Sequence, residues 1–300
     1  MDHELQSGHG RGTTVDEEFG VTEGDTPKAA SSMRDLGVRI ASAAVLAAIV
    51  LVALWAGSLP FAILVAIIGV VVAWEWGRIV RSADIDAIMV IQAVAIITAV
   101  LLAARGLAGL GLIAVLVAAI ISTFLAFGER GHMAALGALY AGLPALALVW
   151  LRGADTAGLL AVLFLMLAVW SADTGAYFAG RLIGGPKLMP RVSPNKTWSG
   201  LLGAIVAAGL LGIIFAMVND LHVGRLAFGG MVLGLVGQAG DLVESALKRT
   251  FDVKDASALI PGHGGFMDRI DGLSADVLAA TVFAMVVNIQ APARALLGLN

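Results

Sequence analysis

Residues 240–271 gather acidic, basic and small side chains in a chain of which only 14% is charged. Four polar residues in this segment are spaced i, i+3, i+4 and i+7, so they share one face of a helix: Asp241, Glu244, Ser245 and Lys248. That face would carry two carboxylates, a hydroxyl and an ammonium group. Charged groups at a bilayer are costly and usually functional. The spacing therefore predicts a chemical site, and the alternative is a solvated charged loop between two membrane helices.

A glycine-rich turn follows this face, with the sequence Pro-Gly-His-Gly-Gly at residues 261–265. Proline lacks a backbone donor, and glycine permits tight turns and the close approach of backbone to a ligand. Asp268, Arg269 and Asp271 come directly after the turn. Carboxylates from two places in the chain, flanked by Lys and Arg, suit a hard divalent cation together with phosphate groups. We therefore expect a site that binds both.

A second polar segment, residues 172–200, lies earlier in the chain. Asp173 falls near the end of an apolar run, one helical turn before Tyr177, where a carboxylate is costly unless it is paired or binds a metal. The alternative is an Asp exposed at the membrane interface. Glycines interspersed with cations come next: Gly180, Gly184, Gly185, Lys187, Arg191 and Lys196. Such a segment is able to cradle phosphate groups, although it lacks P-loop spacing, and the alternative is a basic loop that only fixes topology.

The sequence Ser-Pro-Asn-Lys-Thr at residues 193–197 predicts a turn that leads into another helix. Thr197 or Ser199 is positioned to cap the start of that helix with its hydroxyl group. A helix N-terminus that faces this loop would itself favour an anion.

The composition indicates a membrane protein. The chain has 300 residues, 59% of them hydrophobic, and its mean hydropathy is +0.92. Ordinary soluble domains are nearer ~45–50% apolar. We therefore expect an all-α fold, a polytopic integral membrane helical bundle. The chain has no cysteine, which excludes disulfides, thiolate metal sites and a Cys nucleophile.

Apolar runs long enough to cross a bilayer, about 20 residues each, predict about nine transmembrane helices. Eight or ten remain alternatives, because little separates the third run from the fourth. The polar residues 1–33 are expected to form a disordered cytosolic tail, residues 34–151 the N-terminal transmembrane helices, and residues 152–300 the C-terminal catalytic transmembrane region. The nine apolar runs that we expect to cross the membrane lie near residues 37–56, 60–79, 85–104, 106–127, 133–151, 156–179, 200–218, 226–247 and 272–291.

The positive charges predict the orientation of these spans. With the N-terminus inside, all but four of the 19 Lys and Arg residues fall on the inner side. Such a bias is what the positive-inside rule expects. The loops at 180–199 and 248–271 then share the cytoplasmic side, as they must if they build one site. We expect a multi-pass protein of the plasma membrane with its N-terminus and active site in the cytoplasm. The four basic residues that fall on the outer side of the membrane are Arg105, Arg152, Arg225 and Arg294.

The polar segments resemble a known family. The pattern Ser245-x-x-Lys248-Arg249, then Lys254-Asp255, then His263-Gly264-Gly265-x-x-Asp268-Arg269-x-Asp271 resembles the signature of the phosphatidate cytidylyltransferases, also called CDP-diacylglycerol synthases. The segment from Asp173 to Tyr177 and the Ser-Pro-x-Lys-Thr-Trp turn are also similar to that family. The resemblance is strong over about residues 165–290. One departure is Ser199, where the family turn has Glu.

The resemblance implies transfer of a cytidylyl group: CTP and phosphatidic acid give CDP-diacylglycerol and pyrophosphate. The lipid phosphate is already an anionic nucleophile, so the chemical problem is to bring two polyanions together and to stabilise the departing pyrophosphate. Metal ions and fixed cations suit that task. We expect Mg2+ as the cofactor, with one or two ions in the site.

The resemblance implies roles for individual residues. Asp241 and Asp268 are expected to hold the catalytic metal, with Asp173, Glu244 and Asp271 as secondary ligands or supporting groups. Phosphate contacts are expected from Lys248, Arg249, Lys196 and Arg269. The catalytic set is Asp241, Asp268, Lys248, Arg249 and Asp271. The substrate-binding set is Lys196, Ser193, Thr197, Tyr177, Ser245, His263, Gly264, Gly265 and Arg269.

The expected partners are CTP, phosphatidic acid, the lipid bilayer and a second copy of the chain in a homodimer, with no nucleic acid. Several glycines are expected to make close helix contacts, either within the chain or in the homodimer. The glycines expected at close helix contacts are Gly137, Gly142, Gly203, Gly209 and Gly212.

Glu75 lies between Trp74 and Trp76. It is a candidate to line the site cavity, but the flanking tryptophans favour a place at the headgroup level.

Two other functions are alternatives. A CTP-dependent lipid kinase of the polyprenol or dolichol type resembles this family in its C-terminal region, but it needs a hydroxyl nucleophile and more help from a general base. A transporter is disfavoured because the charges gather at one membrane face, whereas transporter sites lie midway through the spans. The full signature favours cytidylyl transfer.

Overall fold

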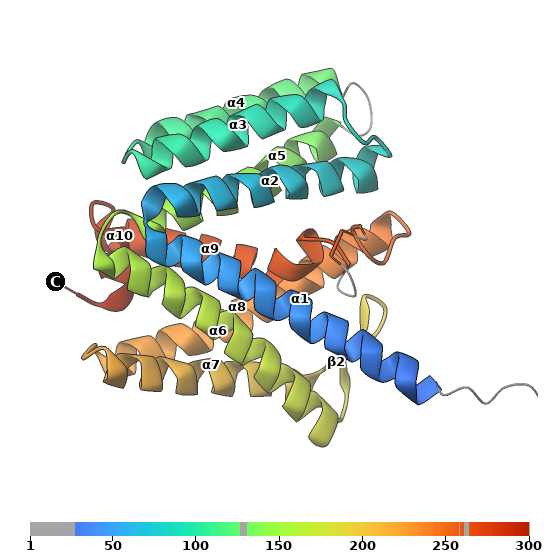
Figure 1. Cartoon of the computed structure of the whole chain (residues 1–300), viewed down its shortest axis with the longest axis vertical. Coiled ribbons are helices and arrows are strands. Elements are labelled where there is room, and N and C mark those ends of the chain that lie inside the picture. Colours follow the sequence, from blue (N-terminus) through green and yellow to red (C-terminus); the bar gives the residue numbers. More distant parts are fainter. Residues whose placement is uncertain (1–27, 127–130, 258, 261–263, 300) are drawn as a thin grey trace, which may run out of the picture.

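The computed structural model describes residues 28–126, 131–257, 259–260 and 264–299, and their side chains from residue 41 onward. The described chain is nearly all helical, with one small antiparallel hairpin, which confirms the expected fold class (Figure 1). Its elements in order are α1 (Lys28–Ala56), α2 (Ser58–Arg81), α3 (Ala87–Ala104), α4 (Ala108–Leu125), α5 (Gly131–Arg152), α6 (Thr156–Leu182), β1 (Lys187–Met189), β2 (Ser193–Thr197), α7 (Trp198–Val218), α8 (Val223–Thr250), α9 (Met267–Asn288) and α10 (Pro292–Leu297).

Eight helices in the described ranges, α2 to α9, are long and apolar enough to cross a membrane. The first expected span falls in α1, of which Ala41–Ala56 is an apolar helix within the residues whose side chains are described. The separation between the third and fourth runs is real, because α3 ends at Ala104 and α4 begins at Ala108. Helix α1 begins at Lys28, so residues 28–33, at the end of the expected tail, are helical. Residues 1–27 lie outside the described ranges.

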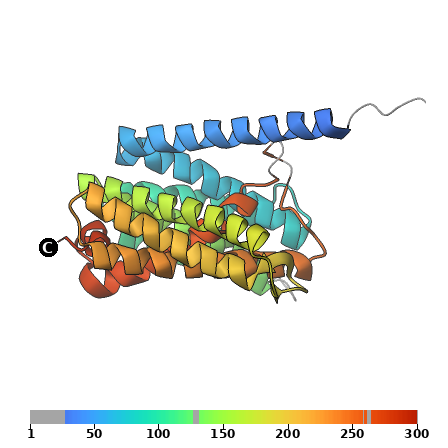
Figure 2. The same ribbon diagram turned by 90° about the horizontal axis from the view of Figure 1, so that it is seen from below.

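The long helices alternate in direction, so their connections fall at two ends of the bundle (Figure 1). Helices α2 to α5 pack on one another, and α6, α7 and α8 form a second group. Helix α9 contacts α5, α6 and α8 and so joins the two groups. Helix α1 lies alongside this bundle and packs on α2 (Figure 2).

Small residues allow these helices to approach closely. A Cβ atom on Gly142 of α5 would lie 2.9 Å from Val115 of α4, and one on Gly209 of α7 would lie 2.7 Å from Met231 of α8. Such close approach is typical of membrane helices, where packing replaces the hydrophobic effect between helices. The glycines expected at helix contacts therefore all pack within this chain, with the other three against Trp76, Gly175 and Leu226: Gly137, Gly203 and Gly212.

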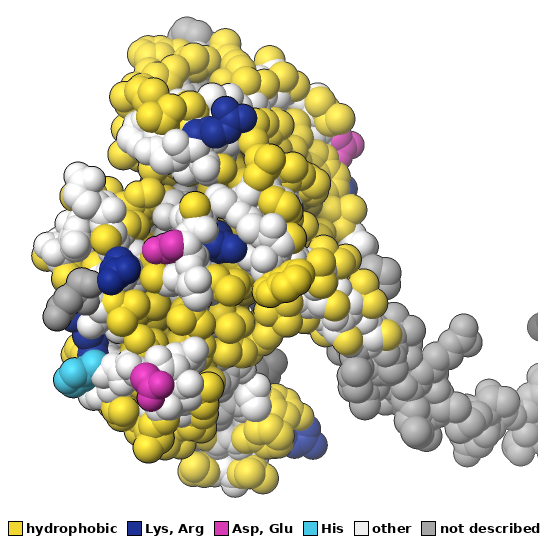
Figure 3. Space-filling model, turned by 60° about the vertical axis from the view of Figure 1, so that its left-hand side comes forward, with side chains coloured by type: hydrophobic (Ala, Val, Ile, Leu, Met, Phe, Trp, Pro, Cys, Tyr) yellow, Lys and Arg dark blue, Asp and Glu magenta, His cyan; other side chains and the backbone are white. Residues whose placement is uncertain are grey.

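The outer surface is apolar over most of its area, as a lipid-facing surface requires. Figure 3 shows one face on which hydrophobic side chains dominate and charged side chains are scattered. Exposed large apolar residues lie on nearly every long helix, for example Ile67, Phe124 and Leu210. The fold is therefore a helical bundle whose polar groups must gather inside it or at its ends.

Two aspartates at helix starts act as N-caps. Asp86 accepts a hydrogen bond of 2.7 Å from the N–H of Met89 at the start of α3, and Asp155 accepts one of 2.9 Å from Gly158 in α6. Arg81 also donates to Asp86. Burial acts to raise the pKa of Asp86, but these hydrogen bonds outweigh it and hold the pKa below its ordinary value.

Candidate active site

The two polar segments meet at one end of the bundle. The β1–β2 hairpin follows α6, and the segment between α8 and α9 lies at the same end, on the right in Figure 1. The two strands pair antiparallel, with Lys187 opposite Thr197 and Met189 opposite Ser193. The sequence predicted only a turn at residues 193–197, because the pairing depends on a partner strand several residues away. The expected proximity of the two loops is confirmed.

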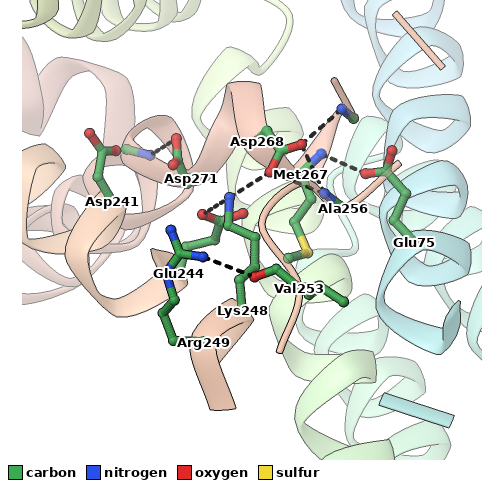
Figure 4. A network of polar contacts seen from close by, with 12 residues as sticks. Glu75, Asp241, Glu244, Lys248, Arg249, Val253, Ala256, Met267, Asp268 and Asp271 are labelled. Carbon is green, nitrogen blue, oxygen red and sulfur yellow. Dashed lines mark hydrogen bonds and ion pairs between the residues drawn. The ribbon is translucent and has the colours of Figure 1, made fainter. Parts of the chain in front are cut away.

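Lys248 lies at the centre of the site (Figure 4). Its Nζ atom is 2.8 Å from Oε2 of Glu244, one turn earlier on α8, and 2.6 Å from Oδ1 of Asp268 on α9. The side chains of Lys248, Glu244 and Asp268 are 12%, 1% and 7% exposed. An ion pair this deeply buried is costly to break, because the remaining charge loses its partner. The shared helix face predicted from the sequence is therefore confirmed, and it joins α8 to α9.

Asp268 also organises the segment before α9. One of its oxygens accepts hydrogen bonds from the N–H of Ala256 at 3.0 Å and from the N–H of Gly265 at 2.8 Å. Gly264 has a φ of +82°, which favours glycine, and a Cβ atom there would lie 2.9 Å from Asp268. The glycines of the signature therefore let the backbone wrap around this carboxylate. In the structure these glycines lie close to Asp268 and Glu75, and their expected part in substrate binding stays a prediction.

Glu75 of α2 holds the same segment from the opposite side. Its carboxylate accepts hydrogen bonds from the hydroxyl of Ser257 and from the backbone N–H groups of Phe266 at 2.9 Å and Met267 at 2.7 Å. Glu75 is 0% exposed. The preference for a headgroup-level position is therefore wrong, because these donors compensate the burial of the carboxylate. Its contacts are 182 to 192 residues away in the chain, so no local pattern reveals them.

Asp241 connects α8 to the hairpin. Its Oδ2 atom lies 2.9 Å from Nζ of Lys196 on β2, and that ammonium group also donates to the carbonyl of Gln238 at 3.3 Å. The carboxyl group of Asp271 is within hydrogen-bonding reach of Asp241. Gly272 permits this approach, because a Cβ atom there would lie 2.9 Å from Oδ1 of Asp241.

The hairpin leads directly into α7. The hydroxyl of Thr197 accepts a hydrogen bond of 3.0 Å from the N–H of Gly200, which confirms the cap expected from Thr197 or Ser199. Ser199 instead donates its hydroxyl to the carbonyl of Gly184. This residue therefore fixes the glycine turn before β1.

A cleft of about 440 Å³ separates the hairpin from the end of α8. Three cationic side chains line it, Lys248, Arg249 and Lys254, and they face a wall of β2 residues. Fixed cations around a cleft of this size suit a polyanion such as a triphosphate. The other residues that line it are Ser193, Pro194 and Asn195 of β2 with Val192, Ser245 and Asp255.

A larger cavity of about 860 Å³ lies between α1, α2, α5, α6 and α9. Most of its lining is aliphatic or aromatic, for example Val50, Phe61 and Leu148. Its few polar lining residues come from the helices that carry the site: Tyr140, Asp173, Thr174, Arg269 and Ser274. The site therefore has one charged cleft and one apolar cavity.

The remaining residues predicted from the sequence lie at various distances from this centre. Asp173 is exposed and lines the larger cavity, where it accepts a hydrogen bond of 3.4 Å from the amide of Gln238. Arg269 lines the apolar cavity. Tyr177 is 57% exposed and its hydroxyl accepts a hydrogen bond from Arg181, so the structure does not bring it into the cavity or the cleft. His263 lies outside the described residues.

Sequence reasoning also missed Asp276 of α9. It is 1% exposed, and neither of its carboxylate oxygens has a hydrogen-bond partner among the described residues. It lies next to Gly237 of α8, within electrostatic reach of Asp241 and Asp173. An aspartate within an apolar run is the signal that marked Asp173, and the same signal identifies Asp276.

The carboxylates have the chemistry of ligands for a hard divalent cation, and Asp276 adds two oxygens that have no hydrogen-bond partner among the described residues. Within the described parts of the chain, however, no three carboxylate or imidazole side chains converge closely enough to enclose a metal ion. Asp241 and Asp268 are instead held by Lys196 and Lys248. The structure thus places both expected ligands in one site, each paired with an ammonium group.

Comparison with known proteins agrees with this site. The model of the cytidylyltransferase family matches residues 37–290. A phosphatidate cytidylyltransferase of Brucella suis is 41% identical over 261 residues, which cover 85% of this chain and 95% of the relative. Phosphatidate cytidylyltransferases of Bacillus subtilis and Haemophilus influenzae are each 44% identical, over 48% and 40% of this chain and 54% and 44% of their own. The chain belongs to the cytidylyltransferase family.

Proposed function

We propose that this protein is a phosphatidate cytidylyltransferase, which transfers CMP from CTP to phosphatidic acid and releases pyrophosphate. The observation that carries the proposal is the contact network centred on Lys248 and Asp268, which ties the signature residues together beside both a cationic cleft and an apolar cavity. One substrate of this reaction is a triphosphate, which suits the cationic cleft, and the other is a lipid, which suits the apolar cavity. The relatives that cover most of the chain carry the same name.

In the reaction, an oxygen of the phosphatidate phosphate attacks the α-phosphorus of CTP. The bond between that phosphorus and the oxygen bridging to the β-phosphate breaks, and pyrophosphate leaves with the bonding electrons. The attacking oxygen is already anionic, so the site needs no strong general base. Its task is to hold two polyanions together and to stabilise charge on the leaving group, which fixed cations accomplish.

The cleft between β2 and α8 is the proposed CTP site. Arg249 and Lys254 line it without forming an ion pair with a carboxylate among the described contacts, so they are available for the β- and γ-phosphates. Lys248 lines the same cleft and reaches Asp268. This places an ammonium group between the triphosphate and the acidic centre, where the α-phosphorus must lie for attack by the lipid.

Mg2+ is the proposed cofactor, because the acidic centre offers carboxylate oxygens, which this ion prefers. Asp241 and Asp268 would hold it, with Asp271 and Asp276 close by. When bound it supplies neutralisation of phosphate charge. Lys196 and Lys248 now pair with these carboxylates, and they would turn to the phosphates when the ion and CTP bind together.

The proposed location is the plasma membrane, with the hairpin end of the bundle in the cytoplasm. CTP then reaches the cleft from the aqueous side, and phosphatidic acid presents its headgroup at the interface. The excess of Lys and Arg residues at this end supports the orientation. A homodimer is also proposed, on the family resemblance alone.

The test is lipid labelling by the purified protein with phosphatidic acid, Mg2+ and CTP labelled at the α-phosphate, beside an Asp268→Ala variant and a sample with EDTA. We expect label in lipid only for the wild type with Mg2+. Label from γ-labelled CTP would instead indicate a lipid kinase. Equal labelling by Asp268→Ala would remove Asp268 from its proposed role, and equal labelling in EDTA would remove the metal.

A further inference from the structure

The apolar cavity has a length that fits one leaflet of a bilayer. Its lining on α2 runs from Phe61 to Val72, and eleven residue steps of a helix span about 16 Å. The hydrocarbon core of a bilayer is about 30 Å thick. Along α2 the cavity is therefore about half as long as the hydrocarbon core is thick, which is the length that the acyl chains of one lipid occupy.

Tyr140 of α5 lies where this cavity meets the acidic centre. Its side chain lines the cavity, and it is within electrostatic reach of Glu244, Asp271 and Asp241. Tyr140 packs against Trp76, with ring centroids 5.1 Å apart, and Trp76 is itself fixed by a hydrogen bond from its Nε1 to the carbonyl of Met133. The phenol ring is therefore held in place from the side away from the cavity.

The Tyr140 hydroxyl is buried and has no hydrogen-bond partner among the described residues. A buried hydroxyl without a partner costs about 1–3 kcal/mol, so such groups normally find one. The hydroxyl group of Tyr140 thus lacks its usual partner among the described residues, at the point where a lipid headgroup would enter.

We propose that Tyr140 is a substrate-positioning residue, whose hydroxyl donates a hydrogen bond to the phosphate–glycerol end of phosphatidic acid while the acyl chains fill the cavity. The inference rests on the proposed function and names a residue outside the signature. The lipid phosphate must reach the acidic centre to attack CTP, and on its way it supplies the acceptor that the hydroxyl lacks. Arg269, which lines the same polar end, supplies positive charge for the same group.

A purely structural tyrosine is the competing explanation, because its ring packs on Trp76. Tyr140→Phe separates the two, since it keeps the ring and removes only the hydroxyl. The matched control is Thr281→Val on α9, which also removes a buried hydroxyl without a partner but at a position that does not line the cavity. A structural role affects both variants in the same way, whereas a positioning role affects only Tyr140→Phe.

The kinetic experiment measures CMP transfer in detergent micelles at varied phosphatidic acid and varied CTP. For Tyr140→Phe we expect the KM for phosphatidic acid to rise about 10-fold, as for the loss of one hydrogen bond to a charged group, with the KM for CTP unchanged. Thr281→Val should leave both constants unchanged. A KM for phosphatidic acid within twofold of the wild-type value, or an equal rise in both constants, would overturn the proposal.

A binding experiment decides the question even if the wild type transfers no CMP. The thermal unfolding midpoint is measured with added phosphatidic acid and with diacylglycerol, which lacks the phosphate. We expect phosphatidic acid to stabilise the wild type and Thr281→Val more than diacylglycerol does, and this difference to shrink in Tyr140→Phe. An undiminished difference in Tyr140→Phe contradicts the role of the hydroxyl, whereas absent CMP transfer by the wild type contradicts the proposed function alone.

Discussion

Oε2 of Glu75 accepts a hydrogen bond of 2.7 Å from the backbone N–H of Met267, 192 residues later in the chain. Met267 is the first residue of α9, and the preceding Phe266 provides no side-chain cap. A carboxylate at this position satisfies N–H groups that a helix start leaves unpaired and favours the positive end of the helix dipole. Helix α2 thus supplies the cap of the helix that carries Asp268 and Asp271.

Replacing Glu75 by Ala should destabilise the protein by about 3 kcal/mol or more, because buried N–H groups lose a charged acceptor. The measurement is the unfolding midpoint in detergent, together with CMP transfer, which should fall because Asp268 follows directly on the freed segment. The control is Asp84→Ala, which removes an exposed carboxylate paired with Arg78 and should cost less than about 1 kcal/mol. Similar midpoints for the two variants would contradict the capping role.

Gly265→Ala should disturb the same contact from the other side. A Cβ atom on Gly265 would lie 2.5 Å from Oε1 of Glu75 and 3.0 Å from the hydroxyl of Ser257, so one of these groups must move. We expect a loss of activity and a lower unfolding midpoint. Gly229→Ala on α8 is the matched control, because nothing lies within 4 Å of its added methyl group, and it should leave the midpoint unchanged or raise it. Wild-type behaviour of Gly265→Ala would show that the segment adapts freely.

The ion pair between Lys248 and Asp268 should appear as energetic coupling. Lys248→Met and Asp268→Asn should each destabilise the protein by about 3–5 kcal/mol, because each leaves a buried partner without its counter-charge. The double variant should cost less than the sum of the two, by about 1–3 kcal/mol. Denaturant unfolding of the four proteins in micelles gives this coupling energy. Additive effects would mean that the contact contributes nothing to stability.

The cleft between β2 and α8 predicts a separation of substrate effects. Arg249→Ala should raise the KM for CTP about 10- to 100-fold, the effect expected when one charged phosphate contact is lost. The KM for phosphatidic acid should remain unchanged, since Arg249 does not line the apolar cavity. Arg181→Ala, which removes an exposed cation that contacts only Tyr177 among the described contacts, is the control. An unchanged KM for CTP in Arg249→Ala would place the triphosphate elsewhere.

The orientation of the bundle is testable by labelling, because the chain has no native cysteine. Lys187→Cys lies on the hairpin and Arg105→Cys lies between α3 and α4 at the opposite end, and both positions are exposed. A membrane-impermeant maleimide should label Arg105→Cys on intact cells and Lys187→Cys only after the membrane is opened. The reverse pattern would place the site outside the cytoplasm.

The sequence by itself determined the helices and the face of α8. Lipid offers no hydrogen-bond partners, so an apolar run of about 20 residues has to fold as a helix whatever its neighbours are. The shared face of Glu244 and Lys248 follows from such local rules, whereas the boundary between α3 and α4 was left open by the sequence and is given by the structure. The signature likewise identified Asp268, because its spacing lies within one short segment.

Only the tertiary structure decided which helices meet at the site. Lys196 reaches Asp241 across 45 residues, and Glu75 and Tyr140 enter from the N-terminal half of the chain. Hydrophobicity does not select neighbours inside a bilayer, since lipid tails are as apolar as the helices. Close approach at small residues selects them: a Cβ atom on Gly234 of α8, for example, would lie only 2.8 Å from the carbonyl oxygen of Ala204 of α7. Such contacts depend on two distant surfaces at once, which is why no local pattern reveals the hydrogen-bond partners of Glu75 or the place of Tyr140 beside the site.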